Sequence, residues 1–61
     1  MKIYTTTEMF HILKPEEIAI SIDSGREVSV NESGTFGWED IDCFLVLNKS
    51  ILSEKWIIRS K

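Results

Sequence analysis

The sequence predicts an α+β fold, in which one short N-terminal helix packs on a small antiparallel meander sheet of four to five strands. Two observations predict it: a helix-capping pattern at residues 5–8, and alternating apolar residues on both sides of a glycine-containing turn at residues 23–26. The chain has 61 residues, so we expect residues 1–61 to form a single domain. A domain this small buries only about 60% of the surface of its unfolded chain, so it depends on a well-packed core or on self-association.

The N-terminal helix is predicted from its start and its stop. Thr5 and Glu8 have the spacing of a capping box, in which the hydroxyl and carboxylate each accept a hydrogen bond from the other residue's amide. The apolar positions that follow at helical spacing, and that we expect to face the core, are Met9, Ile12 and Leu13. Pro15 disfavours helical geometry at Lys14, so the helix should end there.

A change of period predicts a hairpin after the helix. Residues 18–22 alternate isoleucine with small side chains, which is typical of a strand with one apolar face. Gly25 can adopt a positive φ in the turn that follows. Val28 and Val30 then alternate with polar residues, so the second strand of the hairpin lies there.

Two further strands are predicted before the C-terminal segment. Residues 35–38 read as a short third strand with Phe36 and Trp38 on one face, and Gly37 between them indicates a bulge or a close backbone approach. Residues 41–47 are the most apolar stretch and are rich in branched and aromatic side chains. We interpret this stretch as a buried strand.

The C-terminal segment completes the sheet. Residues 50–53 read as one helical turn, capped by Ser50 or Asn48. Residues 55–59 predict a final strand. In that strand Trp56 and Ile58 share one face, and Ile57 lies on the other.

Composition excludes several classes of protein. Cys43 is the only cysteine, which rules out an internal disulfide and fits a reducing compartment. Together with His11, the only histidine, it cannot supply the four ligands of a structural zinc site. No signal peptide is apparent, and the apolar run at residues 43–47 is far too short to span a membrane. We therefore expect a cytoplasmic protein that uses no metal or cofactor and contacts no membrane.

Charge is distributed unevenly along the chain. The net charge is −3, but residues 15–48 carry eight acids and one base, whereas residues 49–61 carry four bases and one acid. The acidic middle argues against nucleic-acid binding, since phosphate contacts need Lys and Arg. The two oppositely charged regions either form two solvated surfaces or form surfaces that meet in a dimer or a partner complex. The acidic run at residues 32–42 could also imitate a nucleic-acid backbone.

Catalysis has little support. His11 and Cys43 are the only classical nucleophile–base pair, and such a pair needs contact and an orienting third group. Asp40 and Asp42 would point to the same side of a strand, where they could share a proton or a divalent cation, or simply be solvated. We therefore expect a protein that is not an enzyme.

Aromatic residues next to acidic ones predict a protein-binding surface, because aromatic side chains carry much of the energy of such interfaces. The alternative for these aromatics is to fill the core. The residues predicted to contact a partner protein are Phe36, Trp38, Glu39, Asp40 and Asp42. An alternative ligand pocket at a subunit interface would use Tyr4, Arg26, Trp56 and Arg59.

The closing segment, residues 51–58, reads Ile-Leu-Ser-Glu-Lys-Trp-Ile-Ile. It resembles the ends of several uncharacterised bacteriophage families, and it is similar to the terminal segment of one Thoeris anti-defence family that sequesters a nucleotide signal. The resemblance implies a host-takeover or anti-defence role. We therefore expect a non-enzymatic phage-type interaction protein that binds and inhibits a bacterial host or defence protein, as a homodimer in the host cytoplasm. The alternative is a protein that sequesters a nucleotide signal.

Overall fold

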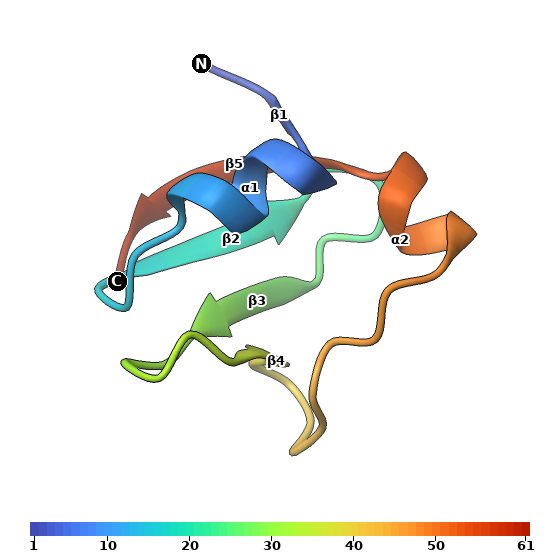
Figure 1. Cartoon of the computed structure of the whole chain (residues 1–61). Coiled ribbons are helices and arrows are strands. Elements are labelled where there is room, and N and C mark those ends of the chain that lie inside the picture. The colour runs from blue at the N-terminus through green and yellow to red at the C-terminus, as the bar shows by residue number, and fades with distance from the viewer.

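Five strands and two helices make up the chain (Figure 1). The computed structural model describes residues 1–61, and its elements in chain order are β1 (Tyr4–Thr5), α1 (Thr6–Ile12), β2 (Glu17–Ser21), β3 (Glu27–Val30), β4 (Phe36–Trp38), α2 (Lys49–Ser53) and β5 (Lys55–Ser60). The strands form one sheet in the order β1-β5-β2-β3-β4, and all neighbours are antiparallel. The predicted α+β fold is therefore confirmed. Neither helix has the length and the apolar content that crossing a membrane requires.

Helix α1 starts where it was predicted to start and ends before the predicted position, Lys14. The Glu8 amide donates to the Thr5 hydroxyl over 3.2 Å, and the Thr5 amide donates to the Glu8 carboxylate over 2.9 Å. The second hydrogen bond lowers the pKa of Glu8. The helix stops at Ile12, because Leu13 already has extended backbone and only its amide still bonds to the helix. Ile12 is 42% exposed, so its predicted place in the core is wrong.

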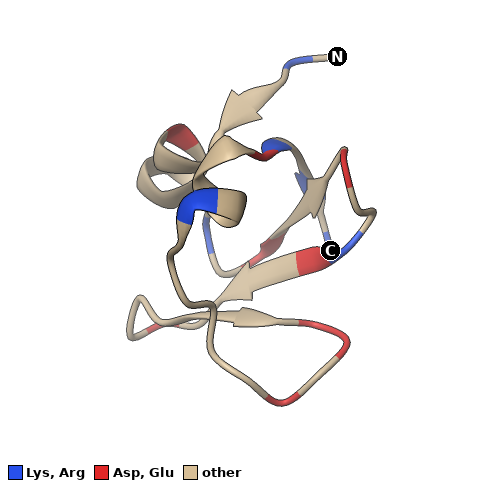
Figure 2. Ribbon diagram, turned by 90° about the vertical axis from the view of Figure 1, so that its right-hand side faces the viewer, with Lys and Arg blue, Asp and Glu red and all other residues tan.

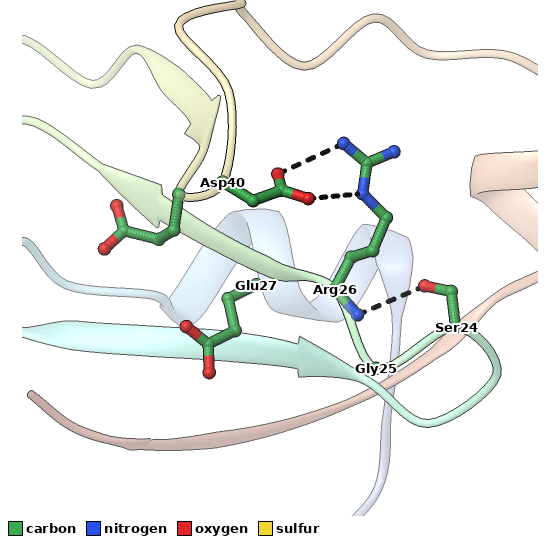
Figure 3. A pocket seen from close by; sticks show the side chains of 6 residues that line it. Ser24, Gly25, Arg26, Glu27 and Asp40 are labelled. Carbon is green, nitrogen blue, oxygen red and sulfur yellow. Dashed lines mark hydrogen bonds and ion pairs between the residues drawn. The ribbon is translucent and has the colours of Figure 1, made fainter.

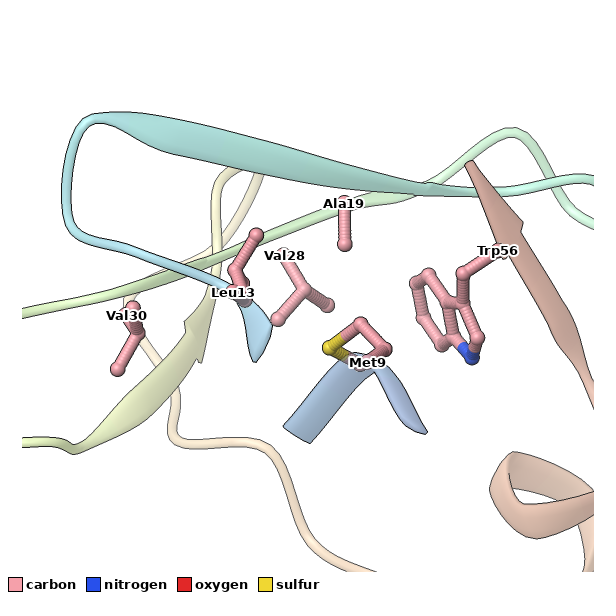
Figure 4. Packing of buried hydrophobic residues seen from close by; sticks show 6 residues of the cluster. All are labelled: Met9, Leu13, Ala19, Val28, Val30 and Trp56. Atoms are coloured by element: carbon pink, nitrogen blue, oxygen red, sulfur yellow. The ribbon is translucent and has the colours of Figure 1, made fainter. Parts of the chain in front are cut away.

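The core lies between α1 and one face of the sheet (Figure 4). Met9 and Trp56 are completely buried there. The remaining members of the cluster are Leu13, Ala19, Val28 and Val30. Phe36, Trp38 and Ile58 pack against its margin. The predicted faces of β4 and β5 are thus confirmed.

The hairpin of β2 and β3 forms as predicted, but the isoleucine face of β2 points away from the helix. Gly25 in the turn has a φ of 76°. Ala19 pairs with Val28 on one side and with Ile58 on the other, and residues opposite one another share a face. Ala19 is therefore buried under α1, and the isoleucines Ile18, Ile20 and Ile22 lie on the opposite face. Met9 and Trp56 fill the space in front of Ala19, which leaves room for a methyl group there (Figure 4).

The prediction of a buried strand at residues 41–47 is wrong. Only Phe44 pairs with the sheet, in an isolated bridge to Gly37, and most of the segment is exposed. Two backbone hydrogen bonds hold the segment there: the Trp38 amide donates to the Cys43 carbonyl, and the Leu45 amide donates to the Phe36 carbonyl. The physical reason is topological: the chain must run from β4, at one edge of the sheet, to β5, which lies beyond β3 and β2 (Figure 1). The chain therefore turns away from the β4 edge after pairing with it at a single position, Phe44 with Gly37.

A single buried hydroxyl joins three elements. The Trp56 indole N–H donates to Thr6 Oγ1 over 2.8 Å, and this hydroxyl in turn donates to the Ile51 carbonyl. Asn48 caps the start of α2 by accepting from the Ile51 amide over 2.9 Å, which selects one of the two predicted caps. Thr6 is completely buried, so β5, α1 and α2 meet at a site shielded from solvent.

Replacing Thr6 with Val keeps the shape of the side chain and removes its hydroxyl. The Trp56 N–H is then buried without an acceptor, whereas the Ile51 carbonyl keeps its bond from the Glu54 amide. We expect Thr6→Val to lower the free energy of unfolding by about 1–3 kcal/mol, measured by urea unfolding followed through tryptophan fluorescence. Thr6→Ser is the control, because it keeps the hydroxyl and should cost about 1 kcal/mol or less. Equal stability of the two variants would contradict the role of the hydroxyl.

Candidate protein-binding surface

Away from the chain termini, the most exposed large apolar side chains lie in the 41–47 segment beside β4. Phe44 is 73% exposed and Val46 is 69% exposed, and Ile41 and Leu47 are about half exposed. Phe44 stands opposite Gly37, which has no side chain to cover the ring. Ile41, Phe44 and Val46, together with Gly37 and Trp38, line an open surface hollow of about 510 Å³. The segment therefore presents apolar groups to solvent in one place.

Acidic residues border this segment. Glu39, Asp40 and Asp42 are all exposed, and no Lys or Arg occurs between Arg26 and Lys49. The loops at the bottom of Figure 2 accordingly carry acidic positions and no basic one. An apolar centre with a charged margin is the general plan of a protein interface.

Arg26 holds the turn after β4 in place (Figure 3). Its guanidinium donates to both oxygens of Asp40, over 3.2 Å each, and lies over the Trp38 ring, 3.9 Å from the centroid. This is the one ion pair in the chain. The hydrogen bond from Arg26 holds the pKa of Asp40 below its usual range. The contact ties the start of β3 to the acidic turn and fixes Trp38 at the rim of the hollow.

The structure separates the five predicted partner-contact residues into two groups. Phe36 is half-buried, and its ring packs on that of Phe10 with 4.5 Å between centroids. Trp38 is also half-buried against the core. The acids lie at the surface, where Asp40 is paired with Arg26 and Glu39 accepts a hydrogen bond from Ser29. The two aromatics are therefore mainly packing residues, and Trp38 alone also reaches the hollow.

Sequence reasoning missed the apolar residues that form the hollow, because it placed residues 41–47 inside the sheet. One signal was available in the composition. The chain is 43% hydrophobic, which is more than one seven-residue helix can cover on one face of a sheet. Some large apolar side chains must therefore be exposed, and a stretch that contains Asp42 near its start is a reasonable place for them.

The alternative ligand pocket is not formed within the chain. Trp56 is completely buried and its N–H is already bonded to Thr6, so within one chain it presents no surface to a ligand. Arg26 is engaged with Asp40. Tyr4 borders a separate hollow next to α1, and Arg59 lines no cavity.

The candidate catalytic pair does not interact. His11 lies on α1, and its Nδ1 is 2.8 Å from the Thr7 carbonyl, to which it must donate because a carbonyl only accepts. Cys43 lies exposed in the 41–47 segment, and no hydrogen bond joins it to His11. No group of three or more His, Cys, Asp or Glu side chains is placed to hold a metal ion.

Comparisons of the chain with protein-family models, with curated proteins and with solved structures find no match. What the arrangement can do is therefore argued from its residues. Exposed apolar side chains with an acidic margin are suited to contact with a protein surface that is apolar at its centre and basic at its edge.

The pair of Asp40 and Arg26 should respond to acid. Because the folded pKa of Asp40 lies below its ordinary value, the pair contributes stability above that value and loses it as the pH falls through the lowered pKa. We expect the Arg26 Nε–H resonance to shift in an NMR titration only at a pH below the ordinary pKa of an aspartate. Asp40→Ala should place that resonance at its acid position at every pH, and Asp42→Ala should leave the titration unchanged. A shift at the ordinary pKa of an aspartate would contradict the pairing.

Proposed function

We propose that this chain is a non-enzymatic interaction protein that binds a partner protein through the 41–47 segment. The observation that supports the proposal is the exposure of four large apolar side chains in seven residues: Ile41, Phe44, Val46 and Leu47. Contiguous exposed apolar patches on small proteins mark interaction sites, because water does not solvate them well. A partner that covers them would gain the hydrophobic free energy that folding leaves unused.

The chemistry of the surface defines the kind of partner. Phe44 is the most exposed aromatic side chain and would insert into an apolar pocket. Glu39 and Asp42 would meet Lys or Arg at the edge of that pocket, which raises the rate of association more than the affinity. The Arg26–Asp40 pair holds the turn before binding, so less conformational freedom is lost on association.

The class of partner rests on the resemblance of residues 51–58 to bacteriophage families. That resemblance supports a bacterial host or defence protein as the partner. In this proposal the chain inhibits its partner by occupying a surface in a stoichiometric complex, and no chemical step is assigned to it. Sequestration of a nucleotide gains no such support, because Trp56 is buried and the hollow around Arg26 is lined by three carboxylates.

The test compares two double variants, each of which replaces two exposed apolar side chains with serine. Phe44→Ser with Val46→Ser changes the proposed site, whereas Ile12→Ser with Leu52→Ser changes exposed apolar residues of α1 and α2. Tagged wild type isolated from bacterial cells should carry a stoichiometric protein, identified by mass spectrometry. With that protein purified, calorimetry should show affinity lowered about a hundredfold by the first variant and little changed by the second.

Circular dichroism of both variants checks that the fold is retained. Equal affinity of the two double variants for the partner would contradict the proposal that the 41–47 segment binds it. Retention of an equimolar partner by the first variant in cells would have the same meaning.

A further inference from the structure

The face of the sheet opposite α1 is apolar and uncovered. None of its side chains is buried. Its centre is formed by four isoleucines on β2, β5 and the turn after β2: Ile18, Ile20, Ile22 and Ile57. Ile20 pairs directly with Ile57, so these two occupy the middle of the stripe. A sheet face of this composition is normally covered by another layer.

Charges of opposite sign lie on the two sides of this stripe. On β5, Lys55 and Arg59 share the face with Ile57, because they alternate with Trp56 and Ile58, which face the core. On the side of β3, Glu27 pairs with Ile20 on the same face. The Glu39 carboxylate accepts from Ser29 Oγ over 2.6 Å, which places it beside β3 on this face too. None of these four charges has an ion-pair partner within the chain.

We propose that two copies of this chain associate through these open faces, with β5 of each copy above β3 of the other. The order β5-β2-β3 makes the face self-complementary: bases on one side, isoleucines in the middle and acids on the other. A two-fold axis parallel to the strands exchanges the two sides, so bases meet acids. A two-fold axis across the strands would instead place β5 above β5, where Lys55 and Arg59 would repel their own copies. Charge therefore selects one of the two face-to-face arrangements.

The strand register identifies the contact to test. Arg59 pairs with Ile18, and the pairing of Ile20 with Glu27 places Ser29 on the other side of Ile18. Arg59 of one copy therefore lies above Ser29 of the second copy and can reach the Glu39 carboxylate bonded to it. Ile18 and Ile20 on β2 would pack on their counterparts at the axis, and Ile57 would lie beside them above β3 of the second copy, at the position of Glu27. The packing is that of aligned sheets, whose strands cross at about −30°.

The small size of the face predicts a dimer that dissociates on dilution. The chain measures 24 × 24 × 19 Å, so one face is small beside the ~800 Å² that each partner buries in a standard interface. The 41–47 segment lies beyond β4, outside the central strands that stack. The dimer therefore uses none of the apolar residues of the proposed partner-binding site, and Glu39 is the one residue that the two proposals share, so the two can fail separately.

Sedimentation equilibrium over a range of protein concentrations tests the proposal. Wild type should pass from monomer to dimer and no further. Ile20→Thr with Ile57→Thr keeps β-branched residues in the strands, and should weaken the dimer about a hundredfold. Arg59→Glu and Glu39→Arg should each weaken it about tenfold. Lys14→Glu, in the exposed loop after α1 and outside the strands that form the proposed face, is the matched control and should have no effect.

The two charge reversals combined give the decisive result. Within one chain Arg59 and Glu39 are separated by β2 and β3, so they can meet only between copies. We expect Arg59→Glu with Glu39→Arg to restore the dimer close to wild-type strength. Phe44→Ser with Val46→Ser should dimerise as wild type does. A monomer at every concentration, or a double reversal weaker than either single one, would overturn the proposal, as would assemblies larger than two.

Discussion

The hydrogen-bonded chain from the Trp56 indole through the Thr6 hydroxyl to the Ile51 carbonyl is the constraint on which the rest of the structure depends. Tryptophan is the largest side chain in the core, and burying it without a partner for its N–H would cost part of what its apolar area contributes. Thr6 solves this at the first turn of α1. The same contact sets the distance between α1 and β5 and draws α2 to both.

This arrangement decides which face of the sheet is covered. The indole and Met9 occupy the space under α1, so β2 must offer small residues there, and Ala19 and Ser21 fulfil that role. The larger isoleucines are forced to the other face. One short helix cannot cover both faces, and the chain is too small to provide a second layer. The exposed apolar surface is therefore a direct result of how the core is packed.

Local signals in the sequence were sufficient for most elements. The capping box of Thr5 and Glu8, the turn at Gly25 and the faces of β5 all depend on neighbouring residues, and the structure confirms them. Orientation and exposure were harder, because they depend on distant contacts. Alternation shows that Ile18 and Ala19 point in opposite directions, but only the position of Trp56 determines which of them is buried. The apolar composition of residues 41–47 could not reveal that this stretch crosses from one part of the sheet to another. Its residues could therefore not be recognised in advance as the candidate site.

The short pairing of Cys43–Leu45 along β4 has a consequence for solubility. An outermost strand with free amides and carbonyls is a template for adding strands from other molecules without end, which leads to fibres. Here the outer edge of β4 is occupied by the chain itself, and the opposite edge, β1, is only two residues long. The β4 edge therefore offers little backbone to another molecule, and on the opposite side β1 covers only Lys55 and Trp56 of β5. Because open-ended growth of a sheet needs two free edges, a protein with so much uncovered apolar surface is thereby protected from open-ended polymerisation.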